Sequence, residues 1–256
     1  MRAMGSGGVL PYNCTCRAIA INVKPVAIFR YARVDEPGHF ATFLSRRGIP
    51  WHLYTLDTGA EVPTSGDAYS GIGMMGGPMS VNDNLPWVAP MEALIRDALS
   101  RDVPMIGHCL GGQLLAKALG MPVTRSPAIE VGWHDLRADD TRLARAWFGD
   151  GPDYTVFQWH VESFQIPPGA TRVLTNDACP NQAYALGKHL GMQFHIELTH
   201  EIISSWLRTG ADEIAAFKVP TVQSVTEIAR DLDGRIAALN AFADRTYARW
   251  IEGLAR

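Results

Sequence analysis

Apolar and polar positions follow two alternating patterns between Lys24 and Met121. Short apolar runs cover 26–31, 51–56, 69–75 and 103–109. Stretches with apolar residues at helical spacing lie between and after them, at 38–48, 86–101 and 110–120. Short strands that alternate with helices are typical of a parallel sheet covered on both faces. The pattern therefore predicts an α/β fold with a mostly parallel sheet in a three-layer, flavodoxin-like arrangement.

The pattern after Met121 is less regular. It contains five short strand candidates, at 129–136, 154–161, 172–177, 182–187 and 190–197. We expect these strands either to extend the sheet or to form an antiparallel flap. From Leu198 the spacing becomes helical again, and this helix is expected to end at Gly210.

The stretch 211–256 is expected to be a helical extension. Its "SVTE" segment has the capping-box pattern, in which Ser224 and Glu227 satisfy each other's end of a helix start. The apolar residues that recur at roughly helical spacing are Val225, Ile228, Leu232, Ile236, Leu239, Phe242, Trp250 and Leu254. We expect this stripe to pack on the body of the same chain, the alternative being a helix that binds a partner. Residues 1–22 are interpreted as an irregular leader, which leaves 23–210 as one domain.

Composition narrows the classes of protein that this chain can belong to. Of its 256 residues, 47% are hydrophobic and 19% are charged, a balance typical of folded globular chains and unlike that of disordered ones. The net charge of −3 provides no basic excess for nucleic acid or for an anionic membrane. There is no apolar run of membrane-spanning length and no basic, apolar signal peptide. We therefore expect a cytoplasmic protein with neither nucleic-acid nor membrane partners.

The four cysteines, at positions 14, 16, 109 and 179, are too few for a disulfide framework in a chain of this length. This indicates a reducing compartment. Cys14 and Cys16 have the spacing of half a metal site, but no second Cys or His pair at ligand spacing follows them. The sequence therefore predicts neither a metal site nor a cofactor.

The segment "GHCLGGQ", residues 107–113, lies where a predicted strand turns at once into a predicted helix. Gly107 and Gly111 flank Cys109 in the G-x-nucleophile-x-G pattern, in which small neighbours allow the sharp turn of a nucleophile elbow. The following helix start favours thiolate over thiol. The alternative is a buried cysteine that only packs, but glycines so close to a helix start weigh against it. Cys179 has no such context and is interpreted as a packing residue.

A cysteine nucleophile needs a base, and a base works best when a third group orients it. In "QFHIE", the strand period of two directs His195 and Glu197 to the same face. Glu197 could then accept the imidazole N–H while the other ring nitrogen faces Cys109. His160, with Glu162 two residues on in "QWHVES", is the competing base.

Together "GHCLGGQ", "GGP" and "QFHIE" resemble the class I glutamine amidotransferases, and "GGPMSV", "EVGW" and "WHVESF" are similar to their stand-alone, GMP-synthase-like branch. The resemblance runs from about Val26 to about Trp206. It implies that Cys109 attacks the side-chain amide of glutamine, that a γ-glutamyl thioester forms with release of ammonia, and that water then frees glutamate. It also implies that His195 is the general acid and base and that Glu197 orients it.

The resemblance further implies an oxyanion hole made of the backbone N–H groups of Gly77 and Leu110. Such a donor can lower the barrier by roughly 3 kcal/mol. Substrate binding is implied for Gln113, and for the main-chain groups of Trp159, Val161 and Glu162 at the amino-acid end of glutamine.

Three positions depart from the branch. Val161 and Glu162 stand where glycine and aspartate are common, and Ile196 replaces the usual proline. No synthetase domain is recognisable, so the ammonia is expected to go to a separate synthetase chain or to be a by-product. Two alternatives stay open: a hydrolase of γ-glutamyl peptides or conjugates with the same triad, and a non-catalytic binding or regulatory subunit. A redox sensor would use a reactive cysteine without a dedicated histidine and glutamate, so the "QFHIE" segment argues against that class.

Overall fold

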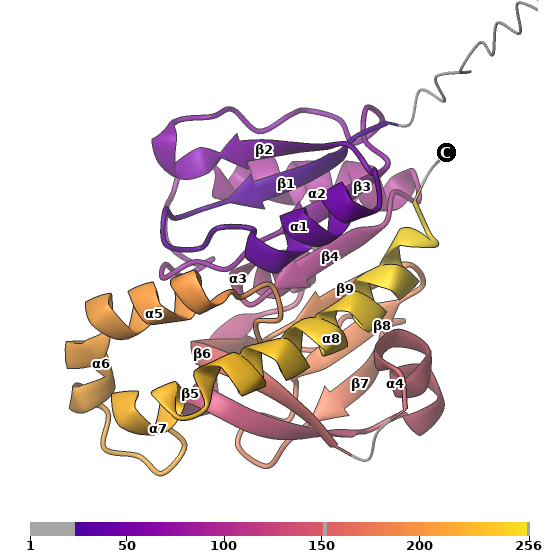
Figure 1. Ribbon diagram of the computed structural model, residues 1–256. Coiled ribbons are helices and arrows are strands. Elements are labelled where there is room, and N and C mark those ends of the chain that lie inside the picture. The colour runs from indigo at the N-terminus through magenta and orange to yellow at the C-terminus, as the bar shows by residue number, and fades with distance from the viewer. Residues whose placement is uncertain (1–23, 151–152, 255–256) are drawn as a thin grey trace, which may run out of the picture.

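A single β-sheet runs through the whole molecule (Figure 1). The first predicted strand is an interior strand of this sheet. The computed structural model describes residues 24–150 and 153–254. Within them, the strands are β1 (Val26–Arg30), β2 (Trp51–Thr55), β3 (Gly71–Met74), β4 (Met105–His108), β5 (Val123–Ala138), β6 (Asp153–Phe164), β7 (Thr171–Thr175), β8 (Ala183–Leu186) and β9 (His189–Met192). They form one nine-stranded sheet in the order β2-β1-β3-β4-β9-β8-β7-β5-β6.

The sheet has a parallel and an antiparallel half. Strands β2, β1, β3, β4 and β9 are parallel neighbours. Strands β8, β7, β5 and β6 continue the sheet from β9 with antiparallel pairs. The predicted α/β class is therefore confirmed. Of the two alternatives for the irregular second half, the strands extend the sheet, and they do so with antiparallel pairs. Short connections join β6, β7, β8 and β9, whereas α4 lies between β5 and β6.

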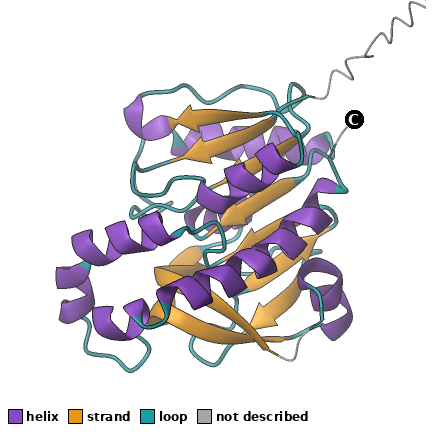
Figure 2. Cartoon of the chain, in the orientation of Figure 1, coloured by secondary structure: helices purple, strands orange, loops and turns teal. Residues whose placement is uncertain are grey.

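Helices cover both faces of the sheet (Figure 2). They are α1 (Gly38–Arg46), α2 (Val88–Ser100), α3 (Leu110–Ala118), α4 (Thr141–Phe148), α5 (His200–Thr209), α6 (Ala211–Ala216), α7 (Val225–Ala229) and α8 (Leu232–Ile251), with a 3₁₀ turn at Leu56–Thr58. Side chains of α1, α4, α5 and α8 contribute to one buried apolar cluster, and side chains of α2 and α3 contribute to the other. This is the three-layer arrangement expected from the alternating pattern. Helix α4 was not expected, because it lies in the irregular second half.

After α6, the C-terminal stretch continues with two consecutive helices, α7 and α8. The capping box is present at the start of α7, where Ser224 Oγ accepts from the Glu227 N–H and Glu227 accepts from the Ser224 N–H. Asp231 separates the two helices with φ +50°, a left-handed conformation that ends the helical path. Helix α8 then buries Phe242, Tyr247 and Trp250 against the sheet layer and α1.

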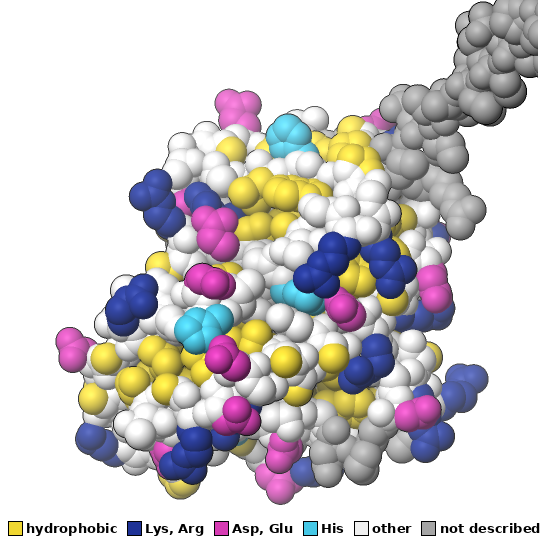
Figure 3. Space-filling model, in the orientation of Figure 1, with side chains coloured by type: hydrophobic (Ala, Val, Ile, Leu, Met, Phe, Trp, Pro, Cys, Tyr) yellow, Lys and Arg dark blue, Asp and Glu magenta, His cyan; other side chains and the backbone are white. Residues whose placement is uncertain are grey.

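Charges of both signs are interspersed over the face that carries α1 and α8 (Figure 3). No helix among the described residues is long and apolar enough to cross a membrane. The predicted leader, 1–22, with Cys14 and Cys16, lies outside the described residues.

Candidate active site

Cys109 occupies a strained corner between β4 and α3. Its φ of +47° is unusual for a residue with a side chain, and it stands at the N-cap of α3. The neighbouring glycines permit this turn, because a Cβ atom on Gly107 would collide with the backbone of Gly111, and one on Gly111 would collide with the backbone of Met74. The predicted elbow geometry is therefore present, and the glycines are needed for close backbone approach.

The thiol of Cys109 lies between a hydrogen-bond donor, which can stabilise a negative charge on sulfur, and a carbonyl acceptor, to which the S–H group can donate. Gln193 Nε2 donates to Sγ at 3.5 Å, and Sγ lies 3.8 Å from the carbonyl oxygen of Trp159. The start of α3 adds the positive end of a helix dipole. The side chain is 5% exposed, yet it lines a cavity, so a small molecule can reach it.

His195 and Glu197 form the buried pair expected from "QFHIE". Nδ1 of His195 lies 2.6 Å from Glu197 Oε1, and the Ile196 N–H donates to Glu197 Oε2 at 2.9 Å. Strand β9 ends earlier, at Met192, and His195 is held instead by one bridge, in which its N–H donates to the Phe157 carbonyl at 2.9 Å. The alternation of side chains thus continues past the strand end.

The pKa values of this pair are coupled to the thiol. Burial alone would lower the pKa of His195, but Glu197 and Cys109 outweigh it and raise that pKa well above its usual value. Burial acts to raise the pKa of Glu197, but His195 and His108 outweigh it and lower that pKa to about 2. These charges favour an imidazolium at His195 beside an ionised Glu197.

His108, the neighbour of the nucleophile, points away from the pocket. Its Nδ1 lies 3.2 Å from the Met74 carbonyl, so Nδ1 carries the proton and donates. Its Nε2 then accepts from the Tyr247 hydroxyl at 3.0 Å and lies 4.0 Å from Glu197 Oε2. Burial lowers the pKa of His108, which agrees with a neutral ring. Through Tyr247, helix α8 therefore reaches the carboxylate that holds His195.

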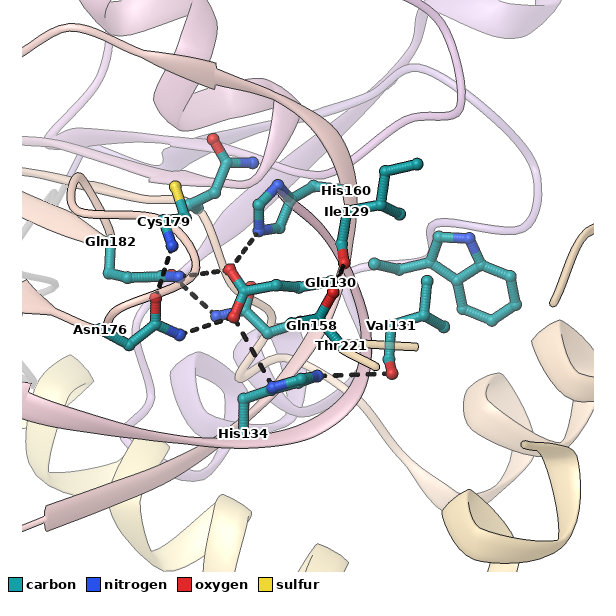
Figure 4. A network of polar contacts seen from close by, with 12 residues as sticks. Ile129, Glu130, Val131, His134, Gln158, His160, Asn176, Cys179, Gln182 and Thr221 are labelled. Carbon is teal, nitrogen blue, oxygen red and sulfur yellow. Dashed lines mark hydrogen bonds and ion pairs between the residues drawn. The ribbon is translucent and has the colours of Figure 1, made fainter. Parts of the chain in front are cut away.

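His160 and Glu162, the competing pair, do not come together. Nε2 of His160 lies 3.1 Å from Glu130 Oε2, across the β5–β6 ribbon (Figure 4). Glu162 instead accepts from Ser80 Oγ at 2.7 Å. The alternation of side chains along a strand places residues 160 and 162 on one face. It does not reveal that His160 pairs instead with Glu130, which lies 30 residues earlier in the chain.

Glu130 is the centre of a buried polar network (Figure 4). Besides His160, it accepts from Asn176 Nδ2 at 2.6 Å and from Gln182 Nε2 at 2.7 Å. Glu130, His160 and Cys179 bring possible metal ligands within 4.8 Å of one another. Both carboxylate oxygens are already used by protein donors, so a cation would have to displace these hydrogen bonds. The network is therefore better suited to fixing β5, β6 and the 176–182 segment than to binding a metal.

Gly77, whose N–H is expected to contribute to an oxyanion hole, lies against the side chain of Leu110, the residue expected to contribute the second N–H. A Cβ atom on Gly77 would be 2.6 Å from the Leu110 side chain, so only glycine fits there. Within the described residues, neither N–H donates to a backbone carbonyl. Gly77 also lines the cavity beside Cys109. The Gly77 N–H is thus available to a ligand oxygen in the cavity, whereas the Leu110 N–H stays an expected second donor.

The cavity in front of Cys109 has a volume of about 490 Å³. It is lined by all four residues predicted to bind substrate, namely Gln113, Trp159, Val161 and Glu162. Gln113 Nε2 donates to the Glu162 carbonyl at 3.1 Å, so one of these residues fixes the main chain of another. Arg125, opposite Glu162 in the β5–β6 register, adds a cation to the wall.

Sequence reasoning missed three residues of this site. Gln193 lies two residues before His195, so the same period-two rule could have placed it beside the thiol. Trp206 of α5 packs edge-on against the His195 ring, with 4.9 Å between ring centroids. Asp35, in the β1–α1 loop, is a cavity-lining carboxyl whose pKa burial raises to about 7, against the opposing effect of His195 and with a smaller push from Glu197. No local sequence signal marked Trp206 or Asp35.

A family model and two solved structures similar to this chain all indicate the same protein family. The family model described as "Glutamine amidotransferase class-I" matches residues 40–210. The crystal structure of a glutamine amido transferase from Methylobacillus flagellatus superposes with a TM-score of 0.89 at 45% identity, covering 91% of this chain and 96% of that one. A glutamine amidotransferase from Thermotoga maritima gives a TM-score of 0.80 at 25% identity, covering 89% and 98%.

Curated sequences agree with the structures. The glutamine amidotransferase-like protein YfeJ of Salmonella typhimurium is 26% identical over 188 residues, which are 71% of this chain and 79% of YfeJ. The glutamine-hydrolyzing GMP synthase of Aeropyrum pernix is 30% identical over 185 residues. These are 68% of this chain, which spans about a third (35%) of the length of that synthase.

Proposed function

Because this chain belongs to the class-I glutamine amidotransferase family, we propose that it hydrolyses the side-chain amide of glutamine through a thioester on Cys109. Family membership supports glutamine amide hydrolysis in general. The roles of individual residues are our proposal. The arrangement that carries it is the buried His195–Glu197 pair beside a cysteine at a nucleophile elbow, at the wall of one cavity.

The first half of the reaction forms the thioester. The thiolate of Cys109 attacks the amide carbon, and the carbonyl oxygen becomes an oxyanion that accepts from the N–H groups of Gly77 and Leu110. Glu197 holds Nδ1 of His195, so the imidazolium presents Nε2 to the leaving nitrogen. His195 then donates its proton, the C–N bond breaks, and ammonia leaves.

The second half returns the enzyme to its starting state. His195, now neutral, takes a proton from water, and the resulting hydroxide attacks the thioester carbon. The same two N–H groups hold the second oxyanion. The C–S bond breaks, glutamate leaves, and the proton on His195 restores the thiolate–imidazolium pair.

The opposite end of the cavity suits the amino-acid end of the substrate. Gln113 fixes the Glu162 carbonyl, and Trp159, Val161 and Glu162 line the same cavity, which supports binding of the substrate by their main-chain groups. Arg125 can attract the substrate carboxylate, and Glu162 can attract its ammonium group.

We further propose a separate synthetase chain as the acceptor of the ammonia. The support is that a glutamine-hydrolyzing GMP synthase matches this chain over only part of its own length. A γ-glutamyl peptide or conjugate is the second candidate substrate, because the same acyl chemistry would serve it and the 490 Å³ cavity is lined also by Trp206 of α5 and Glu213 of α6.

The test is to incubate the purified protein with glutamine and with γ-glutamyl dipeptides, and to assay ammonia and released amine separately. Ammonia from glutamine, abolished in Cys109→Ser, is the expected result. Amine release without ammonia would establish the second candidate instead. Turnover retained by Cys109→Ser, or no turnover of either substrate by the unaltered protein, would overturn the proposal.

A further inference from the structure

The carboxyl group of Asp35 has no role in the reaction derived above, although it lies in the same cavity. The residue is 6% exposed, and among the described residues its Oδ2 has no hydrogen-bond partner. A buried polar atom without a partner costs free energy, so such atoms call for an explanation. Because Asp35 lines the cavity with Cys109 and His195, a bound ligand could offer its carboxyl group a donor.

Gly76 shows which end of the cavity Asp35 occupies. A Cβ atom on Gly76 would lie 3.2 Å from Asp35 Oδ1 and 2.6 Å from His195 Cε1. The side chains of Asp35 and His195 therefore both pack against Gly76, the residue directly before the expected oxyanion donor Gly77. The substrate's amino-acid end already has a carboxylate of its own, Glu162. Asp35 thus belongs to the reacting end.

The loop that carries Asp35 is tied to the catalytic segment. Trp206, which packs on His195, donates from Nε1 to the Val34 carbonyl at 2.7 Å. On the other side, the His39 N–H donates to the Glu197 carbonyl at 2.7 Å. These bonds hold the carboxyl in place before a substrate arrives, so little ordering is needed on binding.

We infer that Asp35 accepts a hydrogen bond from the leaving nitrogen of the substrate and so selects amides whose nitrogen carries hydrogen. This inference rests on the proposed function. His195 addresses the same nitrogen as proton donor, and Asp35, at the Cε1 edge of that ring, is placed to hold one of its N–H groups. A primary amide has two N–H groups and no substituent to seat beside the carboxyl. The geometry therefore favours free glutamine over γ-glutamyl peptides.

The test compares glutamine with glutamate γ-methyl ester, whose leaving atom is an oxygen without hydrogen. At pH 8, above the Asp35 pKa of about 7, kcat/KM for glutamine is expected to fall by roughly 10- to 100-fold in Asp35→Ala, the loss typical of a hydrogen bond to a charged group. Asp35→Asn, which keeps an acceptor oxygen without the charge, is expected to lose less. For the ester, kcat/KM is expected to stay unchanged or to rise. Retained ester turnover also shows that the triad is intact. Glu36→Gln is the matched control, because that carboxylate pairs with Arg30 outside the cavity, and both substrates should be unaffected.

Two results would overturn the inference while leaving the proposed function in place. One is an equal loss for amide and ester, which would mean that Asp35 supports the fold or the triad. The other is full glutamine turnover in both Asp35 variants. An unaltered protein that releases neither ammonia nor methanol would instead overturn the proposed function and this inference with it.

Discussion

Two buried histidine–glutamate pairs lie close together: His195–Glu197, just past the end of β9, and His160–Glu130, between β6 and β5. They differ in which nitrogen and oxygen atoms are already bound by other protein groups. His195 is bound through its main chain to Phe157, three residues from His160 on β6. In the first pair, Glu197 Oε1 holds Nδ1 of His195, and Nε2 is left for the thiol of Cys109. In the second, Glu130 is surrounded by amide donors, and among the described residues Nδ1 of His160 has no partner.

Residue type and burial are therefore poor guides to function here. Both carboxylates are buried, and both have lowered pKa values because hydrogen bonds and nearby histidines outweigh the effect of burial. Both histidines line the 490 Å³ cavity, so the pairs differ in their neighbours: His195 lies beside Cys109, whereas Glu130 is bound by the side-chain amides of Asn176 and Gln182. In the proposed reaction the first pair transfers protons, whereas the second pair joins β5, β6 and the 176–182 segment by hydrogen bonds.

The largest expected effect separates the two histidines directly. His195→Ala should lower kcat for glutamine by roughly 10³-fold or more, because it removes the proton donor to the leaving group. His160→Gln should keep kcat within the same order of magnitude but lower the free energy of unfolding by about 1–3 kcal/mol, because it disturbs a buried hydrogen bond. Ammonia release and denaturant unfolding of both variants measure this. A large loss of kcat in His160→Gln with His195→Ala still active would exchange the roles.

Much of the first pair was predictable from sequence, and the second was not. Cys109 is marked by adjacent glycines, and His195 and Glu197 lie two residues apart, so both signals are local. Glu130 meets His160 only because two long strands pair across 30 residues with a register shift. Asp35 enters the site through a loop that packs against Gly76, which no short pattern encodes. The break between α7 and α8 was missed for a related reason: Asp231 takes a left-handed conformation within an otherwise helical pattern.

Asp35 is a third buried carboxyl group, and its pKa is raised, whereas the pKa values of Glu130 and Glu197 are lowered. An unfolded aspartate ionises near pH 3.8, and the folded group ionises near pH 7. As pH rises from about 4 to 7, the unfolded state loses its proton first, so stability is lost over this window. Asp35→Asn has no carboxyl group to ionise, so it should not lose this stability. Its free energy of unfolding at pH 8 should therefore exceed that of the unaltered protein by up to about 4 kcal/mol.

This prediction is checked by thermal unfolding of both proteins at pH 4.5 and pH 8. The difference between them should be small at the lower pH and should favour Asp35→Asn at the higher. A difference that does not change with pH would show that the carboxyl ionises normally. A gain in stability together with the expected loss of glutamine turnover would identify Asp35 as a group kept for function at a cost in stability.

The smallest expected effect concerns the link from α8 to the first pair. Tyr247→Phe removes the hydroxyl that donates to His108 Nε2 and leaves that nitrogen buried without a partner, which should cost about 1–2 kcal/mol of stability. Because His108 lies 4.0 Å from Glu197 Oε2, kcat should fall severalfold, whereas KM should not change, since Tyr247 touches no part of the cavity. Tyr154→Phe is the matched control: it also loses one hydroxyl bond, to the Gly149 carbonyl, but far from the triad. If both variants changed kcat equally, the helix would support the fold alone; a loss confined to Tyr247→Phe would make α8 part of what positions Glu197.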